Sequence, residues 1–88
     1  MTRSEIEHRV VQALSSVAPE VDATTLAREA PLRDQVDLDS MDFLRFIIEL
    51  HHQFGVDFPE ADYQELASLA GAVEYVAARV GLPRQPGS

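Results

Sequence analysis

Apolar residues recur at helical spacing at both ends of the chain, and this pattern restricts the fold more than any other feature of the sequence. Near the N-terminus five of them follow the spacing i, i+4, i+7, i+8 and i+11: Ile6, Val10, Ala13, Leu14 and Val17. Near the C-terminus four follow the same kind of spacing: Leu69, Val73, Val76 and Val80. The pattern predicts helices over residues 4–17 and 69–80, stopped by Pro19 and Gly81.

Two further helices are expected between these. One begins at Ser40 and continues to about Phe54, where Gly55 ends it. The other is short, from Glu60 to Leu66, because Pro59 is well placed to open a helix. The longer helix has apolar residues on most of its circumference, which predicts a central helix packed on more than one side. They are Phe43, Leu44, Phe46, Ile47, Ile48 and Leu50.

Residues 18–39 show no period, and prolines at 19 and 31 interrupt them. We expect a long loop with one short helical turn near residues 25–29, although loops of this length are unusual in a small domain. Scattered apolar residues are expected to hold the loop against the core: Val21, Leu26, Leu32, Val36 and Leu38. No segment alternates as a strand does. The predicted fold is therefore all-α, a small four-helix bundle of three longer helices and a short third helix, with a long loop between helices 1 and 2.

A chain of 88 residues suits one domain, which we place at residues 1–82, followed by a flexible C-terminal tail at 83–88 that contains Pro and Gly. No apolar run approaches the length of about 18 residues that a membrane helix needs. The N-terminus leads directly into a charged, periodic segment, so we expect no secretory signal and a cytoplasmic location. We also expect a monomer.

The chain has no cysteine and a net charge of −8. It therefore has no disulfide, no thiolate metal site and no thiol of its own. His51 and His52 are adjacent on a helix and point in different directions, so no metal site is expected. The acidic excess lies mainly between Asp37 and Glu65, where Arg45 is the only basic residue besides histidine. This charge disfavours nucleic acid and favours basic partner surfaces, although a solvated acidic face is the simpler interpretation.

Ser40 stands at the predicted start of the central helix, between Asp39 and the pair Met41 and Asp42. Taken alone, a serine there is a plain helix cap. The same position would present its hydroxyl to a modifying enzyme on a rigid element. No histidine stands at a plausible dyad spacing in sequence, and no Gly-x-Ser-x-Gly turn surrounds Ser40, so it has no means of activating itself. The sequence therefore indicates a substrate of another enzyme and not a catalytic nucleophile.

The run from Leu32 to Asp42 resembles the attachment segment of acyl carrier proteins, which commonly ends in Asp-Ser-Leu. Residues 48–59, where a helix ends in Phe and an apolar–Pro pair follows, resemble the same family, and residues 68–76 resemble the start of its fourth helix. The resemblance implies a four-helix fold and a 4′-phosphopantetheine arm on Ser40, transferred from coenzyme A by a separate phosphopantetheinyl transferase. Asp39, Met41 and Asp42 would then be flanking recognition residues.

The arm would supply the thiol that the chain lacks, and acyl groups would ride on it as thioesters, partly sheltered among the helices. Candidate acyl-pocket residues are Leu44, Ile47, Ile48, Leu66, Leu69 and Val73, for which ordinary core packing is the alternative. Candidate partner-binding residues are Asp37, Asp42, Arg45, Glu49 and Glu60. Three features depart from the family pattern: Asp37-Leu38 where Gly-Ala is frequent, Met41 for Leu, and Arg45, His51 and His52 where acids are common.

The resulting hypothesis is a carrier without enzymatic activity of its own. It delivers acyl intermediates to partner enzymes of fatty-acid, polyketide or related lipid biosynthesis, whose docking surfaces are basic. Because Arg45 and the two histidines replace acids, those surfaces would differ from the ones used in housekeeping fatty-acid synthesis. The alternatives are a peptidyl or aryl carrier of a nonribosomal pathway, and an interaction domain of the same fold in which Ser40 is only a helix cap.

Overall fold

The computed structural model describes residues 2–80 and confirms the all-α prediction. Its elements in chain order are α1 (Arg3–Val17), α2 (Leu32–Gln35), α3 (Ser40–Phe54), the 3-10 helix η1 (Glu60–Leu66) and α4 (Leu69–Val80). Within residues 2–80 there is no strand, only an isolated bridge between Pro31 and Ser68. The predicted domain boundary at residue 82 and the tail at 83–88 lie outside the described residues.

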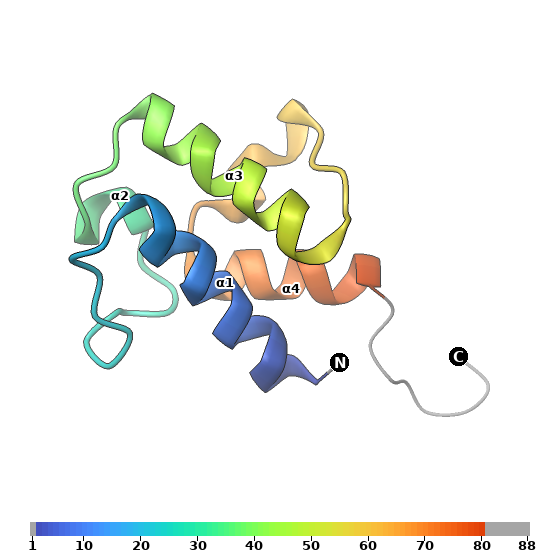
Figure 1. The fold of residues 1–88 in the computed structure, drawn as a ribbon, viewed down its shortest axis with the longest axis horizontal. Coiled ribbons are helices and arrows are strands. Elements are labelled where there is room, and N and C mark those ends of the chain that lie inside the picture. Colours follow the sequence, from blue (N-terminus) through green and yellow to red (C-terminus); the bar gives the residue numbers. More distant parts are fainter. Residues whose placement is uncertain (1, 81–88) are drawn as a thin grey trace.

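The helix α1 packs against both α3 and α4, and the three form the frame of the bundle (Figure 1). Its first turn is fixed by a capping box, in which the Thr2 hydroxyl accepts from the Glu5 N–H at 3.1 Å and the Glu5 carboxylate accepts from the Thr2 N–H at 3.1 Å. The predicted apolar face turns inward, since Ile6, Val10, Ala13 and Leu14 are all buried. Within residues 2–80, no helix has the length and apolar character needed to cross a membrane.

The helix α3 has the predicted bounds and ends at Gly55, whose φ of 66° is left-handed and suits glycine. Phe46, Ile47 and Leu50 form its buried face. The helix packs on more than one side, against α1 and, through Phe43 and Tyr63, against η1. One side stays open: Leu44 and Ile48 are 40% and 47% exposed, and with Met41 they form a solvent-facing stripe. The apolar surface of α3 is therefore larger than the area that α1 and its other neighbours cover.

The long first loop is ordered by a helical turn that lies later than predicted. The turn is α2, Leu32–Gln35, and not residues 25–29. One contact distant in sequence holds it there, since the Leu32 N–H donates to the Ala67 carbonyl at 2.7 Å. Within the loop, the Gln35 amide donates to the carbonyls of Ala27 and Ala30 at 2.8 and 3.1 Å. Leu32 and Leu38 are buried, as expected for residues that hold this loop to the core.

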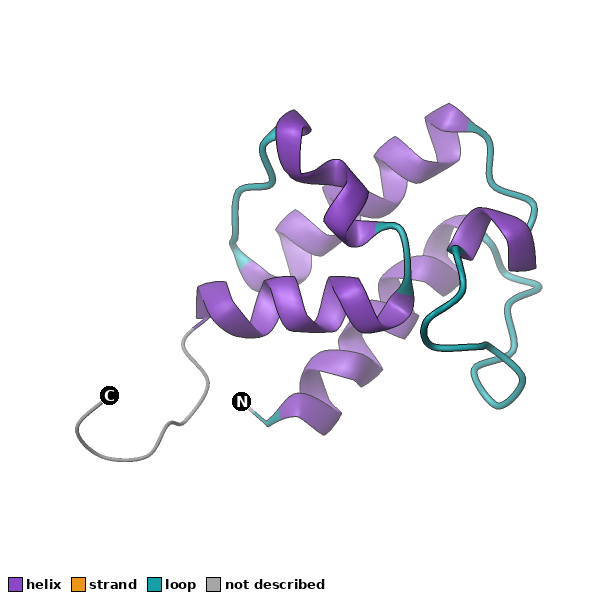
Figure 2. Ribbon diagram, turned by 180° about the vertical axis from the view of Figure 1, so that it is seen from behind, coloured by secondary structure: helices purple, strands orange, loops and turns teal. Residues whose placement is uncertain are grey.

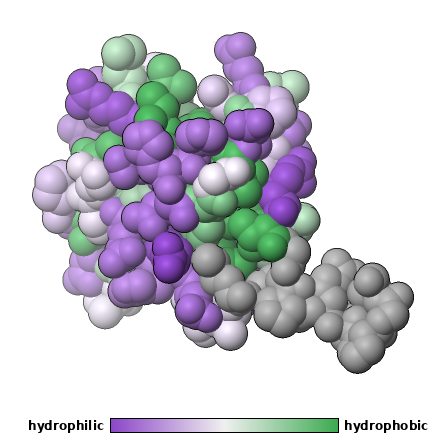
Figure 3. All heavy atoms as spheres, turned by 45° about the vertical axis from the view of Figure 1, so that its right-hand side comes forward, coloured by the Kyte–Doolittle hydropathy of each residue, from purple (hydrophilic) through white to green (hydrophobic). Residues whose placement is uncertain are grey.

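The 3-10 helix η1 joins α3 to α4, and both η1 and α4 lie in front of α3 when the molecule is seen from behind (Figure 2). Ser68 caps α4, because its hydroxyl accepts from the Gly71 N–H at 3.0 Å. Gly71 is required for the close approach of these elements: a Cβ at this position would lie 2.3 Å from the Glu65 carbonyl oxygen. Hydrophilic residues cover much of the face drawn in Figure 3, with apolar side chains reaching the surface between them.

Candidate functional site

The start of α3 is capped by Asp39 and not by Ser40. Asp39 has extended backbone angles, and one of its carboxylate oxygens accepts from the Asp42 N–H at 2.8 Å. The Asp42 carboxylate in turn accepts from the Asp39 N–H at 3.4 Å, which completes a capping box. The interpretation of Ser40 as a helix cap is therefore wrong, because the neighbouring aspartate satisfies the first turn.

Ser40 is the first residue of α3, and it is exposed. Among residues 2–80 its hydroxyl has no hydrogen-bond partner in the structure. Met41 beside it is 62% exposed, and Asp37 and Asp39 are exposed as well. A phosphodiester on the Ser40 oxygen would fit this position, because it would extend from the surface without displacing a buried side chain. The positive end of the α3 dipole favours an anion there.

The candidate partner-binding residues are all at least partly exposed. Asp42, Arg45 and Glu49 follow the spacing i, i+3 and i+7 and share one side of α3. Asp37 and Arg45 are exposed, whereas Asp42 and Glu49 are partly covered. Glu60 is exposed at the start of η1. The surface near Ser40 is thus mixed: acids flank the stripe of Met41, Leu44 and Ile48, and Arg45 interrupts them.

The candidate acyl-pocket residues divide between the core and the surface. Four belong to the packed core and are at most 4% exposed: Ile47, Leu66, Leu69 and Val73. Leu44 and Ile48 lie outside it, on the exposed side of α3. At the four buried residues the structure shows ordinary core packing, which was the alternative interpretation. Two surface depressions lie elsewhere, one over the loop residues 20–26 with Gln35 and Val36, and one along α1.

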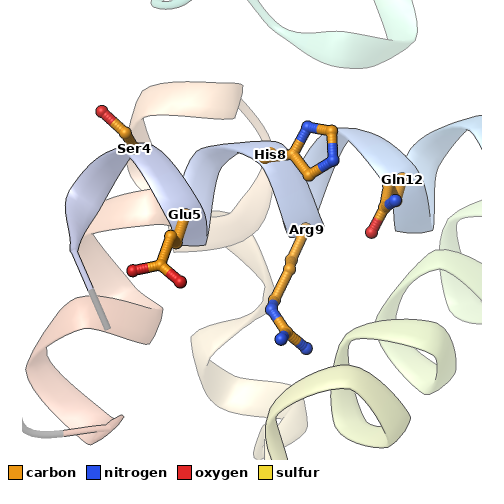
Figure 4. A pocket seen from close by; sticks show the side chains of 5 residues that line it. All are labelled: Ser4, Glu5, His8, Arg9 and Gln12. Carbon is orange, nitrogen blue, oxygen red and sulfur yellow. The ribbon is translucent and has the colours of Figure 1, made fainter.

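The depression along α1 is open and polar. Figure 4 shows its lining residues, Ser4, Glu5, His8, Arg9 and Gln12, on one helix. Arg9 turns toward α3, where one of its guanidinium nitrogens lies 3.5 Å from the Gln53 side-chain oxygen. This depression is separate in sequence from the start of α3 and takes no part in the candidate site.

A polar network between η1 and α4 was not expected from the sequence. The Tyr75 hydroxyl donates to the Asp62 carboxylate at 2.6 Å, and the Arg79 guanidinium stacks 3.9 Å from the Tyr75 ring centre. Burial, together with the hydrogen bond to Asp62, raises the pKa of Tyr75. Phe58 stacks on the Tyr75 ring, with 5.5 Å between the two ring centres. The network fastens η1, which follows the segment after α3, to the last helix.

Known proteins share this sequence pattern and this fold. The family model for the phosphopantetheine attachment site matches residues 8–76. The acyl carrier protein of Rubrobacter xylanophilus is 30% identical over 76 residues, which cover 86% of this chain and 93% of that protein. The acyl carrier protein of Lactobacillus johnsonii is 28% identical over 76 residues, covering 86% and 94%. A solved structure of the acyl carrier protein from Enterococcus faecalis superposes with a TM-score of 0.74 at 24% identity, over 89% of this chain and 98% of that one.

A helical bundle with an unbonded serine at the start of a helix, together with these matches, defines a phosphopantetheine carrier. The chain belongs to the acyl carrier protein family. Members of this family are carriers and not enzymes, and their prosthetic group is covalently attached 4′-phosphopantetheine. Membership implies interaction with a phosphopantetheinyl transferase and with biosynthetic enzymes.

Proposed function

We propose that the Ser40 oxygen is the attachment point of the 4′-phosphopantetheine arm. We further propose that the protein delivers acyl intermediates to enzymes of fatty-acid, polyketide or related lipid biosynthesis. One observation supports the attachment point above the others: the Ser40 hydroxyl is exposed and free, since Asp39 has taken the capping role. The arm supplies the thiol on which acyl groups are held, and the chain has no cysteine that could do so.

The chain contributes a nucleophilic oxygen and a rigid mount, and the transferase contributes the chemistry. A bond forms between the Ser40 oxygen and the phosphorus that bears pantetheine, while the pyrophosphate bond of coenzyme A breaks. Adenosine 3′,5′-bisphosphate leaves, and the hydroxyl proton passes to the transferase. The mount for Ser40 is α3, whose start is fixed by a capping box and whose Phe46 and Leu50 are buried in the core.

Partner recognition is proposed to use the surface around Ser40. Acids at Asp37, Asp42, Glu49 and Glu60 would face basic groups of the partner enzymes, which speeds their encounter at low ionic strength. Arg45 stands among them and would require an acceptor on the partner. We propose that these encounters take place in the cytoplasm, with the carrier as a monomer.

Incubation with coenzyme A and a broad-specificity phosphopantetheinyl transferase, followed by intact mass measurement, tests the attachment point. The wild type should gain the mass of one arm, and Ser40→Ala should gain none. Ser16→Ala, which removes an exposed serine hydroxyl from α1, is the matched control and should load as the wild type does. An unmodified wild type, or a Ser40→Ala variant that still gains the arm, would refute the proposal.

A further inference from the structure

The phosphodiester of an arm on Ser40 would add a negative charge to a surface that is already acidic. Asp37, Asp39 and Asp42 all lie within three residues of Ser40, and the first two are exposed. The positive end of the α3 dipole amounts to only about half an elementary charge, and the capping box already places the Asp39 and Asp42 carboxylates there. Like charges this close repel one another, so a nearby cation would stabilise the loaded form.

Arg33 is the cation that the fold brings to this segment. It belongs to α2, which residues 36–39 join to the start of α3 (Figure 1). Its Nε donates a hydrogen bond of 3.3 Å to the Leu38 carbonyl. Leu38 is two residues before Ser40, so the Cα atoms of these two residues are at most about 7 Å apart. Arg33 is exposed, and within residues 2–80 its two terminal guanidinium nitrogens have no hydrogen bond or ion pair.

The other arginines of residues 2–80 are engaged elsewhere or lie on another side of α3. Side-chain partners away from Ser40 hold four of them: Arg3, Arg9, Arg28 and Arg79. The fifth, Arg45, is exposed and follows Ser40 by five residues. In an α-helix that spacing turns a side chain by about 140° and moves it about 7.5 Å along the axis. Arg33 is therefore the arginine best placed to meet a group on the Ser40 oxygen.

We infer that Arg33 is the counter-ion of the phosphodiester that joins the arm to the protein, an inference that rests on the attachment to Ser40 proposed above. A guanidinium is planar and always charged, and it can donate to two phosphate oxygens at once. The bond from its Nε to Leu38 holds the side chain beside the attachment segment, and the terminal nitrogens are the donors to the phosphate. The first loop thereby contributes, through α2, to binding the base of the arm.

Thermal unfolding of the unloaded and loaded protein at low ionic strength tests the pairing. The wild type, Arg33→Gln and Arg45→Gln are loaded with coenzyme A and the transferase, and the midpoint of each unloaded form is subtracted from that of its loaded form. This difference should be about 3 °C more negative for Arg33→Gln than for the wild type, because only the loaded form loses the phosphate contact. Arg45→Gln is the matched control and should agree with the wild type within about 1 °C. Equal differences in the wild type and Arg33→Gln, or equal losses in the two variants, would overturn the inference.

A second readout uses the wild type alone and does not depend on how well a variant folds or loads. The Nε–H resonance of Arg33, assigned through its bonded side-chain carbons, should move in the NMR spectrum when the arm is attached, whereas that of Arg45 should stay in place. An Arg33 resonance that does not move would overturn the inference. Fragmentation of the loaded protein separates the two proposals: an arm missing from Ser40 counts against the proposed function, whereas an arm on Ser40 with an unchanged Arg33 signal counts against the counter-ion only.

Discussion

The Tyr75 hydroxyl donates a hydrogen bond of 2.6 Å to the Asp62 carboxylate and thereby joins α4 to η1. Tyr75 is only 4% exposed, and the Asp62 side chain is about one quarter exposed, so the bond lies at the edge of the core. The bond links two elements that follow each other in the chain with only a short turn between them. Its loss should loosen η1 without affecting the frame of α1, α3 and α4.

Tyr75→Phe should lower the free energy of unfolding by about 1 kcal/mol, because a hydrogen bond to a carboxylate is removed while the ring remains. Urea denaturation at neutral pH measures the change. The control is Tyr63→Phe, since the Tyr63 hydroxyl has no hydrogen-bond partner among residues 2–80; it should change the free energy by less than about 0.5 kcal/mol. Equal losses in the two variants would contradict the role assigned to the Asp62–Tyr75 bond.

The same tyrosine should make stability depend on alkaline pH. Burial and the bond to Asp62 raise the pKa of Tyr75 in the folded state above its unfolded value of about 10. The folded protein keeps the proton longer than the unfolded chain, so the contribution is complete below pH of about 10 and is lost as pH rises through the folded pKa. Unfolding free energies measured between pH 8 and 12 should fall less steeply for Tyr75→Phe than for the wild type. Parallel curves would contradict the assignment.

At the start of α3, the residue that stabilises the helix and the residue proposed to carry the arm should be different. Asp39→Ala removes the helix cap and should lower the free energy of unfolding by about 1 kcal/mol, whereas Asp39→Asn keeps an accepting oxygen and should lose less. Ser40→Ala removes a hydroxyl without a partner and should stay within about 0.5 kcal/mol of the wild type. Chemical denaturation of the three variants checks this order. A loss in Ser40→Ala as large as that in Asp39→Ala would show that the serine caps the helix after all.

Gly71→Ala should destabilise the protein although alanine is the better helix former. The new Cβ would meet the Glu65 carbonyl oxygen at 2.3 Å, and relieving that clash should cost about 1–3 kcal/mol. Ala78→Gly is the control, because it makes the reverse exchange at an exposed position of α4 and should lose about 1 kcal/mol through helix propensity alone. A Gly71→Ala variant more stable than the wild type would contradict the close approach of η1 and α4.

Local patterns in the sequence were sufficient to predict the four main helices. Residues 40–54, 60–66 and 69–80 were predicted with the bounds that the structure has, and α1 begins one residue earlier than expected. These segments have strong local signals: a repeating apolar face, a proline or glycine at an end, and a capping residue. The prediction failed at α2, because its position depends on the Leu32 bond to Ala67, which joins residues far apart in the chain.

The attachment of the arm to Ser40 stays a prediction, whereas the alternative in which Ser40 only caps the helix is wrong. The sequence held a signal against that alternative. Asp39 and Asp42 have the spacing of a capping box, and that pattern names Asp39 as the cap. The exposure of Leu44 and Ile48 could not be predicted, because apolar composition does not reveal which face of a helix its neighbours leave open. The Asp62–Tyr75 bond also has no local signature, since it depends on how η1 meets α4.

Fragmentation mass spectrometry of the loaded protein tests the central claim most directly, that the hydroxyl freed by the Asp39 cap is the one that carries the arm. The protein is treated with coenzyme A and the transferase, digested, and each serine-containing peptide is fragmented. We predict the phosphopantetheine mass on Ser40 in every modified molecule and on no other residue. The arm on a different serine, or no arm on any of them, would contradict it.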